Sequence, residues 1–296
     1  MGLPNLSKSM DIARLRYIQS IHESPQHRNP DTLVRHFIPI LARLRAAWLG
    51  REELSELQAD PFYYYLVART KYYDQVVNEA VSDGVQQIIN VGCGCDTRAY
   101  RFKHFLRSKS VKVLECDQPQ AIHAKQKAAK RWRCFDYVEY LPIDLNDDTW
   151  PELEHWLGDR ARTKTLVLME GVSPYINGGN FGRFLVLLAT RLSPGSHVAY
   201  DFKIRGVRDD FGRVGRIQEP FRLSPTRDEV ATFHEALGLR LEHMELSSEL
   251  CARLLPDLAE SAIALFSEDG LVRLQGQVKL RKIDDRQGMK RIAEAV

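Results

Sequence analysis

From residue 85 onward, short apolar runs alternate with segments whose apolar residues recur at helical spacing. The apolar runs predict buried strands, and the segments between them predict helices. The expected strands are residues 88–91, 111–117, 137–144, 165–170, 197–202 and 239–246, and the expected helices are residues 121–131, 153–157, 181–192 and 228–237. This alternation predicts an α/β fold with a mainly parallel sheet covered on both faces.

The last apolar segment, residues 271–280, has a different pattern. Val272, Leu274, Val278 and Leu280 fall on one face, with polar neighbours between them. One apolar face and one polar face are typical of a strand covered on one side only, so we expect a half-covered edge strand here.

The first 82 residues are mostly helical in pattern. An apolar stripe at helical spacing follows Asp31 and continues to Trp48, and Pro39 should kink or split this helix. Residues 51–58 predict a second, short helix. These features predict an N-terminal helical cap, residues 1–82, on a core domain, residues 83–296.

Asp60-Pro61 opens an aromatic-rich helix that closes this cap. Its residues Tyr63, Tyr64 and Tyr65 are consecutive, so we expect at least one of them to line a cleft or meet solvent. Within the core domain, residues 204–224 lack periodicity and hold five arginines. We expect this insertion to contribute to a substrate pocket.

The first predicted strand ends at Gly92-Cys93-Gly94, and Asp96 follows two residues later. Glycines let the backbone turn sharply and approach a ligand closely. A strand, a glycine turn and a helix start are the parts of a nucleotide site at the carboxyl edge of an α/β sheet. A Gly-x-Gly on its own also fits an ordinary tight turn, so other residues are needed to distinguish a nucleotide site from such a turn.

Acids recur where the predicted strands end, at Asp117, Asp144, Glu170 and Asp201. Buried carboxylates are costly unless they are paired or hydrogen-bonded, so packing alone does not explain them. An acid about 20 residues beyond a glycine turn commonly binds ribose hydroxyls, and Asp117 has roughly that spacing. Asp144 is placed to accept from an adenine amino group. Any one of these acids fits a turn or helix cap equally well, but several in register favour a nucleoside site.

The residues after the glycine turn favour one class of nucleoside. A dinucleotide site needs a third glycine, where this chain has Thr97. A carboxylate at Asp96 would repel a pyrophosphate and suit a cationic ligand. The amine or sulfonium of S-adenosyl-L-methionine is such a ligand, so the sequence favours a methyl donor over a nicotinamide dinucleotide.

Composition excludes several other classes of protein. The 296 residues are 27% charged with a net charge of +3, which is too weakly basic to indicate a nucleic-acid partner. The densest basic run, from Lys125 to Arg133, is expected to be a solvated helix face. No window is apolar enough to span a bilayer, so we expect no membrane partner.

Five cysteines without a CxxC pair are typical of a reducing, cytoplasmic location. Cys93 and Cys95 lack a second ligand pair nearby, so no metal site is expected. The sequence sets no oligomeric state.

Several motifs carry a resemblance to a known family. They are Ala68-Arg69-Thr70 with Tyr73-Asp74, the stretch from Val91 to Arg101, Glu115 to Pro119, Asp144-Leu145, and Glu170 to Tyr175. In this order they resemble the leucine carboxyl methyltransferase superfamily of S-adenosyl-L-methionine-dependent enzymes. More narrowly, the chain is similar to its bacterial branch of small-molecule O-methyltransferases associated with polyketide and nonribosomal peptide pathways.

The resemblance implies a class I methyltransferase, Rossmann-like fold under a helical cap. It also implies that Arg69 binds the methionine carboxylate of the donor, a role that suits the fork of a guanidinium. Gly92, Cys93 and Gly94 would pack against the donor.

The rest of the implied donor site follows from the same resemblance. Asp117 would hold the ribose hydroxyls, with Gln118 next to it in the cofactor site. Asp144 and Leu145 would contact the adenine, and Glu170 would line the site.

The catalytic step needs little from the protein, because the donor carries its own leaving group and the acceptor must mainly be aligned with it. A carboxylate acceptor needs no base, whereas a hydroxyl must lose its proton. Tyr175 and Asp201 are the candidates at the cofactor edge, and His22 could belong to a lid. Tyr200 is a further candidate. A positioning or packing role is the alternative for each.

We therefore expect an S-adenosyl-L-methionine-dependent O-methyltransferase that acts on a hydroxyl of a small molecule in secondary metabolism. The alternative is a carboxyl methyltransferase that forms a methyl ester on a protein C-terminus or a free acid. A non-catalytic scaffold is disfavoured by the intact acids, and a nicotinamide-dependent oxidoreductase is disfavoured by Asp96 and the missing third glycine.

Overall fold

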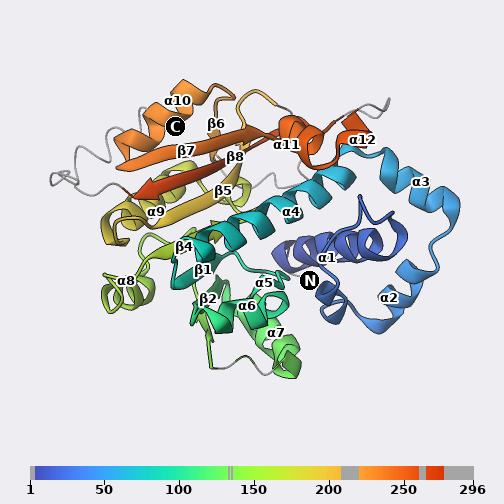
Figure 1. Cartoon of the computed structure of the whole chain (residues 1–296), viewed down its shortest axis with the longest axis horizontal. Helices are drawn as coiled ribbons and strands as arrows, with labels where there is room; N and C mark the ends of the chain where they lie inside the picture. The colour runs from blue at the N-terminus through green and yellow to red at the C-terminus, as the bar shows by residue number, and fades with distance from the viewer. Residues whose placement is uncertain (1–3, 133, 135, 208–219, 260–264, 277–296) are drawn as a thin grey trace.

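The computed structural model describes residues 4–132, 134, 136–207, 220–259 and 265–276. Its centre is one sheet with strand order β3-β2-β1-β4-β5-β8-β7 (Figure 1). The strands are β1 (Gln87–Val91), β2 (Lys112–Asp117), β3 (Val138–Pro142), β4 (Thr165–Met169), β5 (His197–Ile204), β6 (Arg222–Leu223), β7 (Leu239–Leu246) and β8 (Asp269–Gly276). Strands β3, β2, β1, β4 and β5 run parallel, whereas β8 is antiparallel to both of its neighbours. The predicted α/β architecture is confirmed.

Both faces of the sheet are covered, as the apolar runs predicted. Within β1, Ile88 packs into the core on one face and Ile89 into the core on the other. The first face carries α4 (Pro61–Ser82), α5 (Arg98–Arg101), α6 (Lys103–Ser108), α7 (Pro119–Ala129), α11 (Ser247–Leu254) and α12 (Pro256–Ala259). The second face carries α8 (Pro151–Gly158), α9 (Gly178–Arg191) and α10 (Arg227–Ala236).

The N-terminal helices form a layer beyond α4 (Figure 1). They are α1 (Pro4–His22), the short 3-10 helix η1 (Leu33–His36), α2 (Ile40–Ala47) and α3 (Arg51–Ala59). Pro39 splits the predicted helix between η1 and α2, as expected. The split leaves much of the apolar stripe uncovered: Val34 is buried, but Leu41 and Trp48 are 77% and 85% exposed.

The expectation for the three consecutive tyrosines was wrong. Tyr63, Tyr64 and Tyr65 are all buried. Helix α4 packs on the sheet and also contacts α1, α3 and α11, so the directions in which these three side chains lie are covered by protein. This helix therefore joins the N-terminal layer to the sheet.

The expected edge strand lies inside the sheet. Strand β8 runs between β5 and β7, and β7 forms the edge. Leu271 packs into the core on one face, while Val272 and Leu274 pack into the core on the other, so both faces of β8 are covered. Residues 277–280 of the predicted strand lie outside the described residues.

Only the ends of the predicted insertion at 204–224 can be placed. Ile204 closes β5, and β6 pairs in parallel with the end of that strand. Residues 208–219, which include three of the five arginines, lie outside the described part of the chain. Within that part, no helix is long and apolar enough to cross a membrane.

The packing of β8 against β5 predicts that alanine substitutions at two glycines of β8 differ strongly in their effect on stability. A Cβ at position 270 would lie 2.3 Å from Cζ of Phe202, whereas a Cβ at position 276 would meet no atom of the described residues within 4 Å. Gly270→Ala should lower the free energy of unfolding by about 1–3 kcal/mol, because the ring is confined in the core. Gly276→Ala is the matched control and should change it by less than about 0.5 kcal/mol. Urea unfolding measures both, and equal effects would contradict this packing.

Candidate functional site

A cavity of about 220 Å³ opens at the carboxyl ends of the parallel strands. Ser9, Ile12 and Arg16 of α1 also line it. All nine residues expected to bind the cofactor line this one cavity: Arg69, Gly92, Cys93, Gly94, Asp117, Gln118, Asp144, Leu145 and Glu170. They come together because the carboxyl ends of parallel strands meet at one edge of the sheet.

The glycine turn needs its glycines for two separate reasons. Gly92 and Gly94 have positive φ angles, +65° and +37°, which side chains disfavour. In addition, a Cβ at Gly92 would lie 2.3 Å from Cγ2 of Val172, and one at Gly94 would lie 2.6 Å from Oγ of Ser9. The turn is therefore held between the loop after β4 and helix α1.

A buried lysine donates a hydrogen bond to the backbone of the glycine turn. Nζ of Lys125 donates to the carbonyl of Cys93 at 3.0 Å and pairs with Glu115 at 2.5 Å. Both side chains are completely buried. Burial raises the pKa of Glu115 to about 7, although Lys125 acts in the opposite direction. The expectation of a solvated basic face was thus wrong for Lys125, because α7 turns this one position toward the glycine turn.

Two carboxylates and an amide form a row along one side of the cavity. Asp117 accepts hydrogen bonds from the backbone N–H groups of Gly94 and Gln118, each at 2.7 Å. The side-chain amide of Gln118 donates to Asp144 at 2.7 Å. Burial raises the pKa of Asp117 above its usual value. The ends of β2 and β3 are thereby linked directly to the glycine turn.

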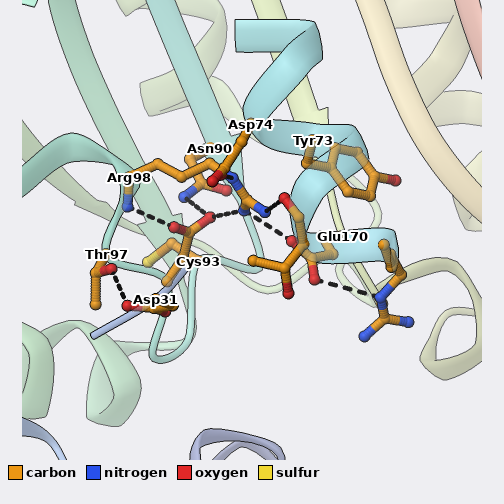
Figure 2. Close-up of polar contacts among 12 residues, drawn as sticks. Asp31, Tyr73, Asp74, Asn90, Cys93, Thr97, Arg98 and Glu170 are labelled. Atoms are coloured by element: carbon orange, nitrogen blue, oxygen red, sulfur yellow. Dashed lines mark hydrogen bonds and ion pairs between the residues drawn. The ribbon is translucent and has the colours of Figure 1, made fainter. Parts of the chain in front are cut away.

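Arg98 is the centre of an ion-pair network that includes Asp96 and Glu170 of the cavity lining (Figure 2). Its Nη1 lies 2.6 Å from Asp96 and 2.7 Å from Glu170, and its Nε lies 2.8 Å from Asp74. Nε of Arg69 binds the other oxygen of Glu170 at 3.3 Å. Burial alone would raise the pKa of Glu170, but Arg98 and Arg69 hold it below its ordinary value.

The structure gives Asp96 a different role from the one inferred from its charge. Besides the Nη1 contact, its carboxylate accepts the backbone N–H of Arg98 at 2.7 Å and the amide of Asn90 at 3.1 Å. Its charge is therefore balanced inside the protein, and it holds the start of α5. It lines the cavity, but it is not a free counter-ion for a ligand.

The cavity is nevertheless acidic as a whole. Six acids line it, against the three cations Arg16, Arg69 and Lys203. Asp96, Glu170, Asp201 and Asp269 are paired with Arg98, Arg69 or Lys203, whereas Asp117 and Asp144 form no ion pair with a described residue. A cationic ligand therefore fits this lining better than an anionic one.

Tyr175 and Asp201, the two catalytic candidates from the cofactor edge, both line the cavity. Asp201 accepts from the hydroxyl of Tyr73 at 3.0 Å and from the N–H of Gly171 at 2.7 Å, and it pairs with Arg69 at 3.4 Å. Burial raises the pKa of Asp201 to about 6, against the effect of Arg69. Burial also raises the pKa of Tyr175.

The other two candidates lie elsewhere. Nε2 of His22 bonds the carbonyl of Ala46 at 2.7 Å, where the end of α1 meets α2. Helix α1 lines the cavity with Ser9, Ile12 and Arg16, whereas His22 is its last residue and is not part of the lining. The hydroxyl of Tyr200 bonds His234 at 2.6 Å inside the core on the second face of the sheet.

Sequence reasoning missed Lys203 and Asp269, which form an ion pair at 2.5 Å in the cavity wall. The two residues face each other in the register of β5 and β8, yet they are far apart in the chain. In the sequence, neither Lys203 nor Asp269 differs from an ordinary polar residue at the end of a strand. It also missed Phe62 and Arg16, which reach the cavity from the helices that cover it.

Comparison of this chain with known proteins identifies its family. The sequence profile of the leucine carboxyl methyltransferase family matches residues 17–187. The chain belongs to this family. A relative from Mycolicibacterium paratuberculosis is 28% identical over 261 residues, which are 79% of this chain and 82% of the relative. Another, from Frankia alni, is 26% identical over 69% of this chain and 70% of its own length.

Both relatives carry the name of S-adenosyl-L-methionine-dependent methyltransferases, in agreement with the donor predicted from the sequence. A crystal structure of a methyltransferase from Thermobifida fusca matches 93% of this chain and 98% of its own, with a TM-score of 0.58 and 15% identity. This likeness confirms the predicted Rossmann-like methyltransferase fold.

No metal is indicated in the described part of the chain, where no three His, Cys, Asp or Glu side chains gather as ligands. Cys93 and Cys95 are free and buried.

The network around Arg98 predicts a pH-dependent loss of stability. Arg98→Met would leave Asp96, Glu170 and Asp74 short of a buried counter-ion and should cost about 3–5 kcal/mol at pH 7. In the wild type, Arg98 holds the pKa values of Asp96 and Glu170 below the unfolded-state values near 4, so both carboxylates stay ionised and their stabilisation is retained at pH 4. In the variant the raising effect of burial is no longer offset by Arg98, so these carboxyls take up protons as pH falls from 7 to 4 and the buried uncompensated charge is lost. The cost should therefore shrink on acidification.

Urea unfolding at pH 7 and at pH 4 measures this difference. Arg183→Met is the matched control, because Arg183 pairs with the exposed Asp148 on the surface. It should cost less than about 1 kcal/mol at either pH. A cost for Arg98→Met that stays constant between the two pH values would show that these carboxylates do not depend on Arg98.

Proposed function

We propose that the protein is an S-adenosyl-L-methionine-dependent O-methyltransferase that methylates a hydroxyl of a small molecule in secondary metabolism. The observation that carries the proposal is the convergence of all nine expected cofactor residues on one acidic cavity. The family to which the chain belongs supports the methyl transfer. The small-molecule acceptor and the metabolic role rest on the motif resemblance described above.

The residues at the strand ends would hold the adenosine half of the donor. Asp117 faces the cavity beside the glycine turn, where it would accept hydrogen bonds from the two ribose hydroxyls. Asp144 and the buried Leu145 would contact the adenine through a carboxylate and an apolar surface. The link through Gln118 keeps these acids in register.

Arg69 would hold the carboxylate of the methionine half. Two of its nitrogens are engaged, Nε with Glu170 and Nη1 with Asp201. Nη2 makes no hydrogen bond to a described residue, and a Cβ on Gly171 in the cavity wall would lie 3.5 Å from it. The two acids thus orient the guanidinium while one edge stays available for a carboxylate.

The donor supplies a methyl group on a sulfonium, so the chain itself needs to bind, align and handle one proton. An excess of acids around the cavity suits a ligand with a net positive charge. For a hydroxyl acceptor, we assign proton removal to the carboxylate of Asp201, whose pKa of about 6 lies near neutrality. Tyr175 would position the acceptor beside it.

The alternative is methylation of a carboxylate, either a protein C-terminus or a free acid. It is favoured by the family itself, which is described by carboxyl methyltransfer. A carboxylate acceptor is already ionised and would give Asp201 no proton to remove. The two functions therefore differ in product and in pH dependence.

Binding of the donor product S-adenosylhomocysteine tests the site. Calorimetry should show binding by the wild type and a loss of roughly 10–100-fold for Asp117→Ala, because a carboxylate that accepts hydrogen bonds from the ribose is removed. Asp147→Ala, which removes an exposed acid after β3, should bind like the wild type. Absence of binding by the wild type would refute the proposal.

The pH profile of methyl transfer separates the two acceptors. With labelled donor and a panel of phenols and benzoic acids, we expect a methyl ether that survives mild base. Its rate of formation should rise with pH through about 6 as Asp201 ionises, and Asp201→Asn should lose most of that rise. A base-labile ester formed at a pH-independent rate would instead establish the carboxyl methyltransferase.

A further inference from the structure

A second cavity, of about 450 Å³, adjoins the first on the side of α7. The two cavities share Ser9, Gly94, Cys95, Asp117 and Gln118. The rest of the second wall comes from α7, from the short 3-10 helix η2 (Lys130–Trp132) that follows it, from Met10 of α1, and from the 3-10 helix η1 with the residue after it. The proposed donor residues therefore explain only the shared wall, and most of this space is left without a function.

The body of the second cavity is apolar. Ala121, Ala124 and Ala128 line it from one face of α7, and their small side chains leave the space open. Met10 and Phe37 line it from the N-terminal layer. A flat or extended apolar group would find contacts on both sides of such a slot.

The cavity is also lined by the cationic groups Lys127 and Arg131, and by His36. Nη1 of Arg131 lies 2.7 Å from Nδ1 of His36, and Nε of Arg35 lies 3.4 Å from Nε2 of the same ring. A neutral imidazole offers only one acceptor nitrogen, so it cannot accept from both arginines. One guanidinium therefore faces a ring N–H, and because both contacts lie at the surface, the N–H group of that guanidinium is open to water or to an anion.

Among the described residues, the acid in the lining of this cavity is Asp117, in the wall shared with the first cavity, and it forms no ion pair with Lys127 or Arg131. Arg35, Arg43 and Arg131 form no ion pair with a described residue, and Nε of Arg43 is buried without a hydrogen-bond partner among them. The chain from Thr32 to Gly50 contains no Asp or Glu. Burial lowers the pKa of His36, and the three arginines lower it further. Elsewhere in the structure, Arg98 and Arg101 are matched by several carboxylates.

We propose that this second cavity binds a small molecule with an apolar body and a phosphate group. The apolar body would lie between the alanines of α7 and Phe37, and the phosphate would bind Arg131, Lys127 and His36. Phosphate suits this end of the cavity because a guanidinium fork matches its oxygens and its charge calls for more than one cation. The site is independent of methyl transfer, although Asp117 and Gly94 lie in the wall shared with the donor cavity.

Calorimetry without the methyl donor tests the proposal, with phenyl phosphate, inorganic phosphate and phenol as probes. Phenyl phosphate should bind at least ten-fold more tightly than either of the other two, because only it fills both ends of the cavity. Binding of phenyl phosphate no tighter than that of inorganic phosphate would overturn the proposal. So would binding to vesicles that contain phosphatidic acid without binding of phenyl phosphate, because that would indicate a surface for lipid headgroups.

Two variants locate the site, and a third is the control. Arg131→Gln should weaken phenyl phosphate at least ten-fold, and Ala124→Leu should weaken phenyl phosphate but leave inorganic phosphate unchanged. Arg227→Gln removes an exposed arginine of α10 and should bind like the wild type. Equal affinities for Arg131→Gln and the control would show that Arg131 is only a solvated surface cation.

Thermal unfolding shows whether each variant is folded, and Lys127→Gln replaces Arg131→Gln if the latter is not. S-adenosylhomocysteine binding is measured in parallel. Normal binding of this ligand with no site for phenyl phosphate would refute the present proposal alone. The reverse result would refute the proposed methyl transfer and leave the second site in place.

Discussion

The buried charge on Arg98 is the interaction on which the rest of the site depends. Its guanidinium binds acids from three segments: Asp74 on α4, Asp96 after the glycine turn, and Glu170 after β4. A carboxylate that loses a buried partner is strongly destabilising, so these segments are constrained together. Through Glu170 the same network reaches Arg69, and thereby orients the side chain assigned to the donor carboxylate.

Much of the site could be predicted because its residues lie at strand ends. The position of Asp117 and Asp144 at one edge of the sheet follows once the strands that precede them are predicted, because parallel strands bring their carboxyl ends to the same edge. The glycine turn was visible as a sequence motif. The paired acids and the motif order then gave the donor, and the family match agrees with this interpretation.

The parts that could not be predicted depend on contacts between distant segments. The Lys203–Asp269 pair exists only because β8 inserts beside β5, which no local pattern indicates. Lys125 looks like its exposed neighbours until α7 is packed over the glycine turn. Asp96 kept its predicted place at the cavity, but its charge is balanced by an arginine two residues away, which a reading of charge without geometry overlooks.

The glycine turn has a consequence for how relatives of this protein are compared. A side chain at Gly92 would strike Val172, and one at Gly94 would strike Ser9, before any ligand is considered. Selection for folding alone would thus preserve both glycines in a descendant that had lost its chemistry. The motif identifies the architecture, and it does not distinguish active members of a lineage from inactive ones. Asp117 is constrained in the same way, because its two carboxylate oxygens accept the backbone N–H groups of Gly94 and Gln118, and an Asn there would face one of these donors with its own NH2 group.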